Sequence, residues 1–297
     1  MFPSFPKALA SCLLSSLCIL PAIAIPVNAL ITTALSGTEL APFDHSLGSG
    51  LLTHLPPPQR GVLAGRTETP GGLFGANGVP DIADLDQTTI PDCGLIAAVG
   101  ALVGQHSEWI TNLFEFKGDA GTTTAATVKL VRGITFQANP KTVQKSSLTN
   151  ARSDAHEGWW VGALEQAITS QEGKVEGIFP DRALEVITGR KATFKIAGNG
   201  SNSGRPGALS KDQFWDLVSN NARKTPMILQ SRAGAVIFTE SHAFWIQAGH
   251  VDGKRWVSLW NPYGIDEVYD LEAIWPWIWG VHMFADMSEQ PRKGKTG

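Results

Sequence analysis

The stretch DQTTIPDCGLIAAVGAL, residues 86–102, places one cysteine where a polar, proline-containing turn becomes an apolar run. The run CGLIAAVGALVGQ is apolar on all sides, which predicts a central, buried helix. Cys93 falls in its first turn, where unpaired N–H groups and the positive end of the helix dipole favour a thiolate. The small residues that let other elements approach the helix axis are Gly94, Ala97, Ala98, Gly100 and Ala101. The stretch therefore predicts an activated cysteine, with a small core hydrophobe as the alternative.

The composition is that of a globular protein with a substantial core. The chain has 297 residues, of which 43% are hydrophobic and 17% charged, a length that suits one large domain or two small lobes. The formal net charge is −3, and no long basic stripe occurs. Nucleic acid is therefore not an expected partner.

The N-terminus has the pattern of a secretory signal. MFPSFPK carries one Lys, an apolar run follows, and VNA at 27–29 offers small residues for cleavage. This predicts a signal peptide over residues 1–29 and a secreted protein. The alternative is an uncleaved membrane anchor over residues 8–25. Because Cys12 and Cys18 would leave with the signal peptide, Cys93 would remain as a single thiol, which marks it as reactive.

The rest of the chain divides by composition into four parts. The Gly/Pro-rich stretch GNGSNSGRPG (198–207) is the best internal boundary. We expect a linker or pro-segment over 30–75, a helical lobe over 76–200, a β-rich lobe over 201–287 and a disordered tail over 288–297. Within them, DAHEGWWVGALEQAITSQEG has a helical period, PMILQSR reads as a buried strand, and Ser210 with Gln213 forms a helix capping box. The fold class is α+β.

A β-hairpin brings one histidine next to one asparagine. AFWIQAGHV and RWVSLW alternate in polarity and are joined by VDGK, whose Asp252-Gly253 is a strong two-residue turn signal. With that turn, Asn261 lies opposite Phe244, and His242 is two residues further along the same strand. His242 and Asn261 then share one face as diagonal neighbours, close enough for the amide to hold the imidazole.

A side-chain amide precedes the cysteine. Gln87 stands six residues before Cys93, on the loop that enters the helix. With the Cys93 backbone N–H, its amide could stabilise the negative oxygen of a tetrahedral intermediate. The alternative is a solvated loop residue.

These motifs together resemble the calpain-type cysteine peptidases, a branch of the papain-like fold. They are Gln six before Asp-Cys, Ser-His-Ala-aromatic, Asn-Pro-aromatic-Gly, and WWVGALEQAITSQEGKVEGI at 159–178. The resemblance covers roughly residues 77–265. It implies two lobes, with Cys93 as nucleophile, His242 as acid/base, Asn261 as its orienter and Gln87 as oxyanion donor.

The chain departs from the family at two positions beside the site. The family usually has Trp after the catalytic Cys and after Asn-Pro, where this chain has Gly94 and Tyr263. The resemblance implies no required cofactor, although family members often bind calcium in the core. Asp84 and Glu176 fall at two such ligand positions, and a plain surface role for both is the alternative.

The sequence thus predicts a secreted, monomeric cysteine endopeptidase acting on protein or peptide substrates. Two alternatives stay open: a transglutaminase-like acyl transferase, and an inactive binding module that keeps the fold. The many tryptophans are also compatible with a carbohydrate-binding surface. Most of them lie in strand or helix patterns, however, which favours packing in the core, and we expect Trp256 and Trp260 to support the site. These tryptophans are Trp159, Trp160, Trp245, Trp256, Trp260, Trp275, Trp277 and Trp279.

Overall fold

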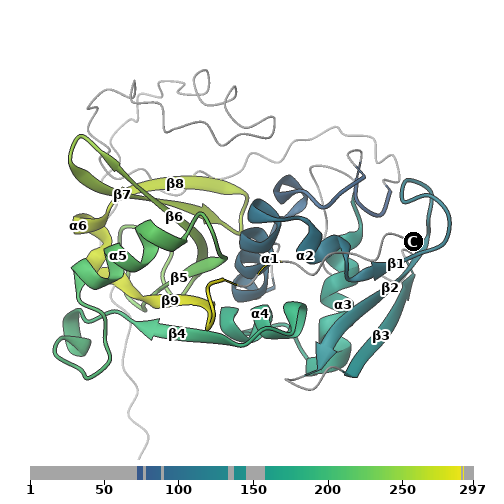
Figure 1. Cartoon of the computed structure of the whole chain (residues 1–297), viewed down its shortest axis with the longest axis horizontal. Coiled ribbons are helices and arrows are strands. Elements are labelled where there is room, and N and C mark those ends of the chain that lie inside the picture. The colour runs from purple at the N-terminus through teal and green to yellow at the C-terminus, as the bar shows by residue number, and fades with distance from the viewer. Residues whose placement is uncertain are drawn as a thin grey trace, which may run out of the picture. The chain divides into compact units, whose positions relative to one another are not determined.

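The computed structural model describes residues 72–75, 78–87, 90–132, 137–144, 158–288 and 290. The predicted signal peptide (1–29), nearly all of the expected linker or pro-segment (30–75) and most of the expected tail (288–297) lie outside these residues. The described part combines α-helices with two antiparallel sheets (Figure 1). The predicted α+β class is therefore confirmed.

One group of elements contains the helices that follow the cysteine and a three-stranded sheet of order β1-β2-β3. We call this group the helical lobe. Its elements are η1 (Ile82–Asp84), α1 (Cys93–Gln105), α2 (Glu108–Thr111), β1 (Phe114–Glu115), β2 (Ala125–Arg132), β3 (Gln137–Gln144), α3 (Trp160–Glu172) and α4 (Pro180–Thr188). The helix α1 has the bounds that the apolar run predicts.

The other group is a six-stranded antiparallel sheet of order β4-β9-β5-β6-β7-β8 with its short helices. We call this group the sheet lobe. Its elements are β4 (Ala192–Ile196), η3 (Gly200–Asn202), α5 (Lys211–Asn221), β5 (Met227–Ser231), β6 (Ala243–Val251), β7 (Lys254–Asn261), β8 (Ile265–Asp270), α6 (Leu271–Ile274), η4 (Trp275–Trp277) and β9 (Ile278–Phe284). The capping box of Ser210 and Gln213 at the start of α5 is present, as predicted.

Two segments lie in a different part of the fold from the one expected. The strand β4 falls within the range expected for the helical lobe, yet it pairs with β9 of the sheet lobe. The chain therefore enters the sheet before the Gly-rich boundary at 198–207. Leu73 and Phe74 fall at the end of the expected linker, but both are buried in the core. Backbone hydrogen bonds to Ala120 and Trp160 hold Leu73 there.

The hairpin of β6 and β7 has the predicted register. Asp252 and Gly253 both take positive φ, 51° and 74°, as the two-residue turn requires. Trp245 then pairs with Trp260, so the next position along puts Asn261 opposite Phe244. His242 lies one residue before β6 begins.

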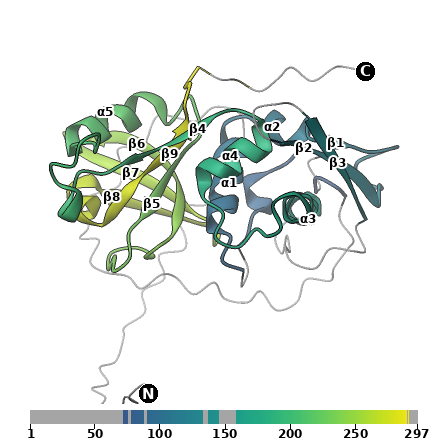
Figure 2. The same ribbon diagram turned by 90° about the horizontal axis from the view of Figure 1, so that it is seen from below.

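Two large aromatic rings of this hairpin pack against glycines of α1. A Cβ atom at Gly100 would lie 2.7 Å from the Trp260 ring, and one at Gly104 would overlap the Trp245 ring. Two views show α1 between the six-stranded sheet and the β1–β3 sheet (Figures 1 and 2). The four tryptophans at 159, 160, 245 and 260 are buried in this core, which confirms core packing for them. Trp256, which was expected to brace the site, is only partly buried.

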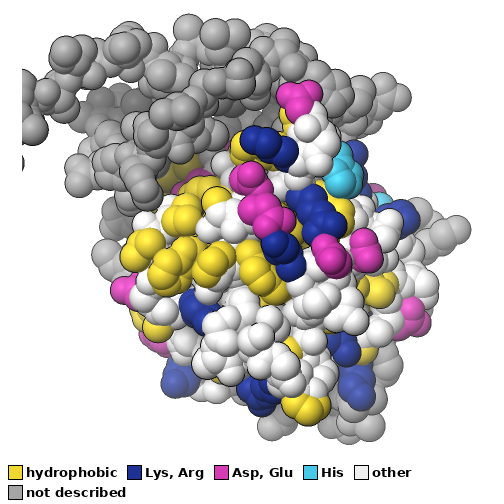
Figure 3. All heavy atoms as spheres, turned by 90° about the vertical axis from the view of Figure 1, so that its left-hand side faces the viewer, with side chains coloured by type: hydrophobic (Ala, Val, Ile, Leu, Met, Phe, Trp, Pro, Cys, Tyr) yellow, Lys and Arg dark blue, Asp and Glu magenta, His cyan; other side chains and the backbone are white. Residues whose placement is uncertain are grey.

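The outer face of the sheet lobe carries charges of both signs. Figure 3 shows Lys or Arg side chains next to Asp or Glu side chains on this face. Two ion pairs of the sheet lobe join Lys211 to Glu272 and Arg255 to Asp212. Among the residues described, no helix is both long and apolar enough to cross a lipid bilayer.

Candidate active site

Cys93 is the first residue of α1, and its side chain is partly exposed. Three backbone N–H groups, those of Ala243, Gly94 and Cys93 itself, lie near enough to the sulfur to lower the pKa of the thiol. Two of these groups belong to the start of the helix, as the sequence predicts. The third belongs to the residue after His242, so the contact joins the nucleophile candidate of one lobe to the histidine of the other.

His242 and Asn261 form the hydrogen bond that the hairpin register predicts. The imidazole Nε2 lies 2.9 Å from Asn261 Oδ1, and both side chains are buried. Because an amide oxygen only accepts, Nε2 carries the proton and Nδ1 is the nitrogen able to take one. Ser231 fixes the backbone of His242 from behind: the His242 N–H donates to Ser231 Oγ at 2.9 Å, and the Ser231 N–H donates to the His242 carbonyl at 2.9 Å.

Tyr263 covers the imidazole. Its ring stacks on that of His242 with centroids 5.2 Å apart and planes 10° from parallel. Burial raises the pKa of the phenol, and the nearby Cys93 and Asp92 raise it further. Tyr263, one of the two departures from the family pattern, thus places an aromatic ring over the histidine and near the thiol.

Gln87 is buried, so the alternative of a solvated loop residue is wrong. Its backbone N–H donates to the carbonyl of Pro262 at 2.8 Å, and this bond ties the loop before α1 to the residue after Asn261. Its side-chain Nε2 donates one proton to the Ile90 carbonyl at 2.8 Å. Since an amide nitrogen carries two protons, one is left to donate to a developing oxyanion.

Burial opposes charge on both reacting groups. It lowers the pKa of His242 to about 4, although the bond to Asn261 acts in the other direction. It also raises the pKa of the Cys93 thiol; the Ala243 N–H lowers this pKa, the charge of Asp92 raises it, and the net change is a rise. Thiol and imidazole are therefore both neutral at pH 7, which differs from the thiolate that the helix start alone predicts. Removal of two groups from water is the physical reason.

A second acidic group lies directly behind the nucleophile. Asp92, the N-cap of α1, is 2% exposed and hydrogen-bonds the buried Glu165 of α3. Burial raises the pKa of Asp92 to about 6; the bond to Glu165 lowers it, and the charge of Glu176 raises it. A negative charge on Asp92 in turn raises the pKa of the Cys93 thiol.

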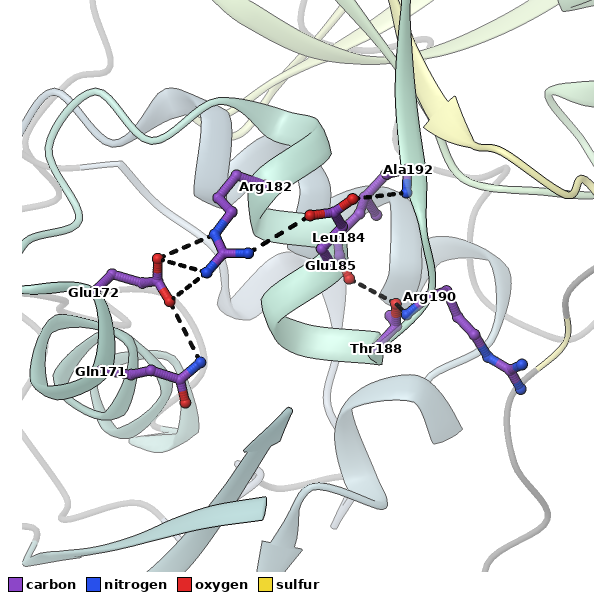
Figure 4. Close-up of polar contacts among 8 residues, drawn as sticks. All are labelled: Gln171, Glu172, Arg182, Leu184, Glu185, Thr188, Arg190 and Ala192. Carbon is purple, nitrogen blue, oxygen red and sulfur yellow. Dashed lines mark hydrogen bonds and ion pairs between the residues drawn. The ribbon is translucent and has the colours of Figure 1, made fainter. Parts of the chain in front are cut away.

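Gly94 stands where a tryptophan could not fit. A Cβ at this position would overlap the carbonyl oxygen of Ile178, so the segment between α3 and α4 passes directly over the start of α1. Both ends of that segment are fixed: Arg182 of α4 makes a bidentate ion pair with Glu172 of α3 and a second pair with Glu185 (Figure 4). The Gly177 N–H also donates to the Pro91 carbonyl at 2.9 Å.

The two expected calcium ligands have other surroundings. Asp84 is buried, and its Oδ2 accepts from Trp160 Nε1 at 2.6 Å and from the Asp81 N–H at 3.1 Å. Glu176 is exposed and accepts from the Val175 N–H. Within the described ranges, no group of three or more His, Cys, Asp or Glu residues is arranged to hold a metal ion. The steps proposed below use no metal ion.

Two residues beside the site were missed from the sequence. Ser231 is the last residue of β5, and nothing in PMILQSR marks it. Glu267 accepts from Asn261 Nδ2 at 3.4 Å. The sequence does contain a signal for Glu267: a short turn at Pro262–Gly264 pairs Asn261 with Ile265, which makes Glu267 a diagonal neighbour of Asn261.

The comparisons with known proteins add no relative. No protein-family model matches the chain, and no curated protein matches it. The candidate function therefore depends on the residues of the site and their geometry.

Proposed function

We propose that the chain is a papain-like cysteine endopeptidase with a calpain-like core, secreted through its N-terminal segment. The observation that carries the proposal is the bond between His242 Nε2 and Asn261 Oδ1, in a structure where the backbone N–H of Ala243 also lies near enough to the Cys93 sulfur to lower its pKa. Nucleophile, base and orienter thus come from a helix start and a hairpin of the other lobe, in the chain order that the resemblance implies.

The reaction begins from the neutral pair. His242 Nδ1 takes the thiol proton as the sulfur attacks the carbonyl carbon of a peptide bond. The carbonyl π electrons move to oxygen, and the remaining proton of Gln87 Nε2 and the Cys93 N–H stabilise that charge. His242 then protonates the leaving amine as the C–N bond breaks, which leaves a thioester. Water, deprotonated by His242, hydrolyses the thioester and restores the thiol.

The first test removes the sulfur. We expect Cys93→Ala to lower hydrolysis of a casein-type substrate below about 10⁻⁴ of the parent rate, since the variant lacks the proposed nucleophile. Circular dichroism and the melting temperature should stay those of the parent. A folded Cys93→Ala variant that cleaves as fast as the parent would refute the proposal.

A second candidate function is a binding module that keeps the fold without the chemistry. The observation that favours it is the neutral state of both Cys93 and His242, because a neutral thiol is a poor nucleophile. Iodoacetamide distinguishes the two: alkylation of Cys93 that slows in His242→Ala supports the peptidase, because His242 then takes the thiol proton, and alkylation that this substitution leaves unchanged supports the module. Ammonia release with crosslinked protein, and no new N-termini, would indicate the transglutaminase-like reaction instead.

A further inference from the structure

A line of hydrogen bonds crosses three strands behind the histidine. It runs from His242, just before β6, through Asn261 on β7 to Glu267 and Tyr269 on β8. Asn261 Nδ2 donates to Glu267 Oε1 at 3.4 Å, and the Tyr269 hydroxyl donates to Glu267 Oε2 at 3.2 Å. The register Leu259↔Glu267 makes Asn261 and Glu267 diagonal neighbours on one face of the sheet.

The amide of Asn261 has only one orientation that suits its neighbours. Its Oδ1 accepts from His242 Nε2 at 2.9 Å and from the Tyr263 backbone N–H at 3.2 Å. A flipped amide would bring Nδ2 against these two donors and Oδ1 against the Glu267 carboxylate. Both contacts would be repulsive, so the carboxylate selects the orientation that holds the imidazole.

We infer that Glu267 is a positioning residue of the site: its carboxylate fixes and polarises the Asn261 amide, which then holds and stabilises the imidazolium of His242. The inference rests on the proposed function for its effect on turnover. A carboxylate acceptor draws the Nδ2 proton and increases the electron density on Oδ1, which strengthens the bond to the Nε2 proton. The effect opposes burial, which favours the neutral ring.

The electrostatic surroundings agree with this role. Burial raises the pKa of Glu267, the bonds from Asn261 and Tyr269 lower it, and the charge of Asp266 raises it. Tyr269 Oη thus occupies the second carboxylate oxygen and directs the first toward Asn261. The Tyr263 phenol stacks on the imidazole, and the Cys93 thiol of α1 lies close enough to that phenol to raise its pKa.

The test is Glu267→Gln, which keeps the shape and removes the charge. Asp266→Asn is the matched control, because it removes a neighbouring charge whose side chain points to the other face of β8. We expect Glu267→Gln to lower kcat about tenfold with KM and melting temperature unchanged, the size that one weak charge-assisted bond supports. Asp266→Asn should stay within about twofold of the parent.

A second measurement tests the positioning role of Glu267 without depending on enzyme activity. The NMR signal of the His242 Nε2 proton at pH 7, assigned with His242→Ala, should move upfield in Glu267→Gln, because the bond of this proton to Asn261 Oδ1 weakens, and should stay in place in Asp266→Asn. Equal kcat and equal proton shifts in the two variants would overturn the inference. If the parent itself shows no peptidase activity, the proposed function fails, and the proton shift alone decides the role of Glu267: an upfield move in Glu267→Gln supports it, and an unchanged position overturns it.

Discussion

On the sheet side of the candidate site, side chains hydrogen-bond one another across strands. On the helix side, the groups around the cysteine belong mainly to the backbone. His242, Asn261 and Glu267 form a hydrogen-bonded row. Cys93 instead contacts three N–H groups and is flanked by Gly94, over which the Ile178 carbonyl passes. The comparison teaches that the two halves fail differently: the sheet side should lose function before stability, and the helix side stability together with function.

The largest effect is expected from filling the space at Gly94. Gly94→Trp restores the usual residue of the calpain-type family, but its side chain must displace the segment that carries Ile178. We expect a loss of at least about 3 kcal/mol in the free energy of unfolding, measured by urea denaturation. The control is Gly249→Ala, where a Cβ would meet nothing closer than 3.9 Å. A Gly94→Trp variant as stable as the parent would show that the segment carrying Ile178 can move away from α1 without loss of stability.

Removal of the Asn261 amide tests the sheet side. Asn261→Ala deletes the acceptor of the His242 Nε2 proton, and we expect kcat/KM to fall about a hundredfold, or roughly 2.7 kcal/mol in the activation free energy. Asn220→Ala, on α5, is the control for a generic loss of an amide. Retention of more than half the parent kcat/KM in Asn261→Ala would mean that the imidazole needs no orienter.

The smallest effect concerns Asp92 and depends on pH. Its pKa is about 6 in the folded chain, against an ordinary value of 3.8. Between these values the folded state binds more protons than the unfolded state, so stability falls as the pH rises from about 4 to about 6. Asp92→Asn removes that loss and should be more stable than the parent at pH 7, with a much smaller gain at pH 4.

Urea denaturation at the two pH values measures this difference. The exposed Asp216→Asn should show no such gain. A pH-independent effect of Asp92→Asn would indicate that the pair with Glu165 matters for its hydrogen bond rather than its charge.

Local signals predicted much of the sheet side. The Asp252-Gly253 turn determines the register of β6 and β7, and the register determines that His242 and Asn261 are diagonal neighbours. The bounds of α1 followed in the same way from one apolar run. In each case, interactions between residues close in sequence, or on adjacent strands, were sufficient.

Contacts between distant segments could not be predicted in this way. The pairing of β4 with β9 and the Ile178 carbonyl over Gly94 bring together parts of the chain far apart in sequence. The burial that neutralises Cys93 and His242 is likewise a property of the assembled lobes. A sequence pattern states which groups are present, but the surrounding packing decides their charge.

The Trp260 ring packs on Gly100 and the Trp245 ring packs on Gly104, and these contacts restrict movement of α1 relative to the hairpin. Gly100 and Gly104 are one helical turn apart, and the two rings come from paired positions on β6 and β7. A slide of α1 along its axis would drive both rings into helix backbone, whereas a small rotation about this contact would not. Cys93, about two turns from Gly100, therefore keeps a fixed position along the helix axis relative to the hairpin that follows His242 and ends at Asn261.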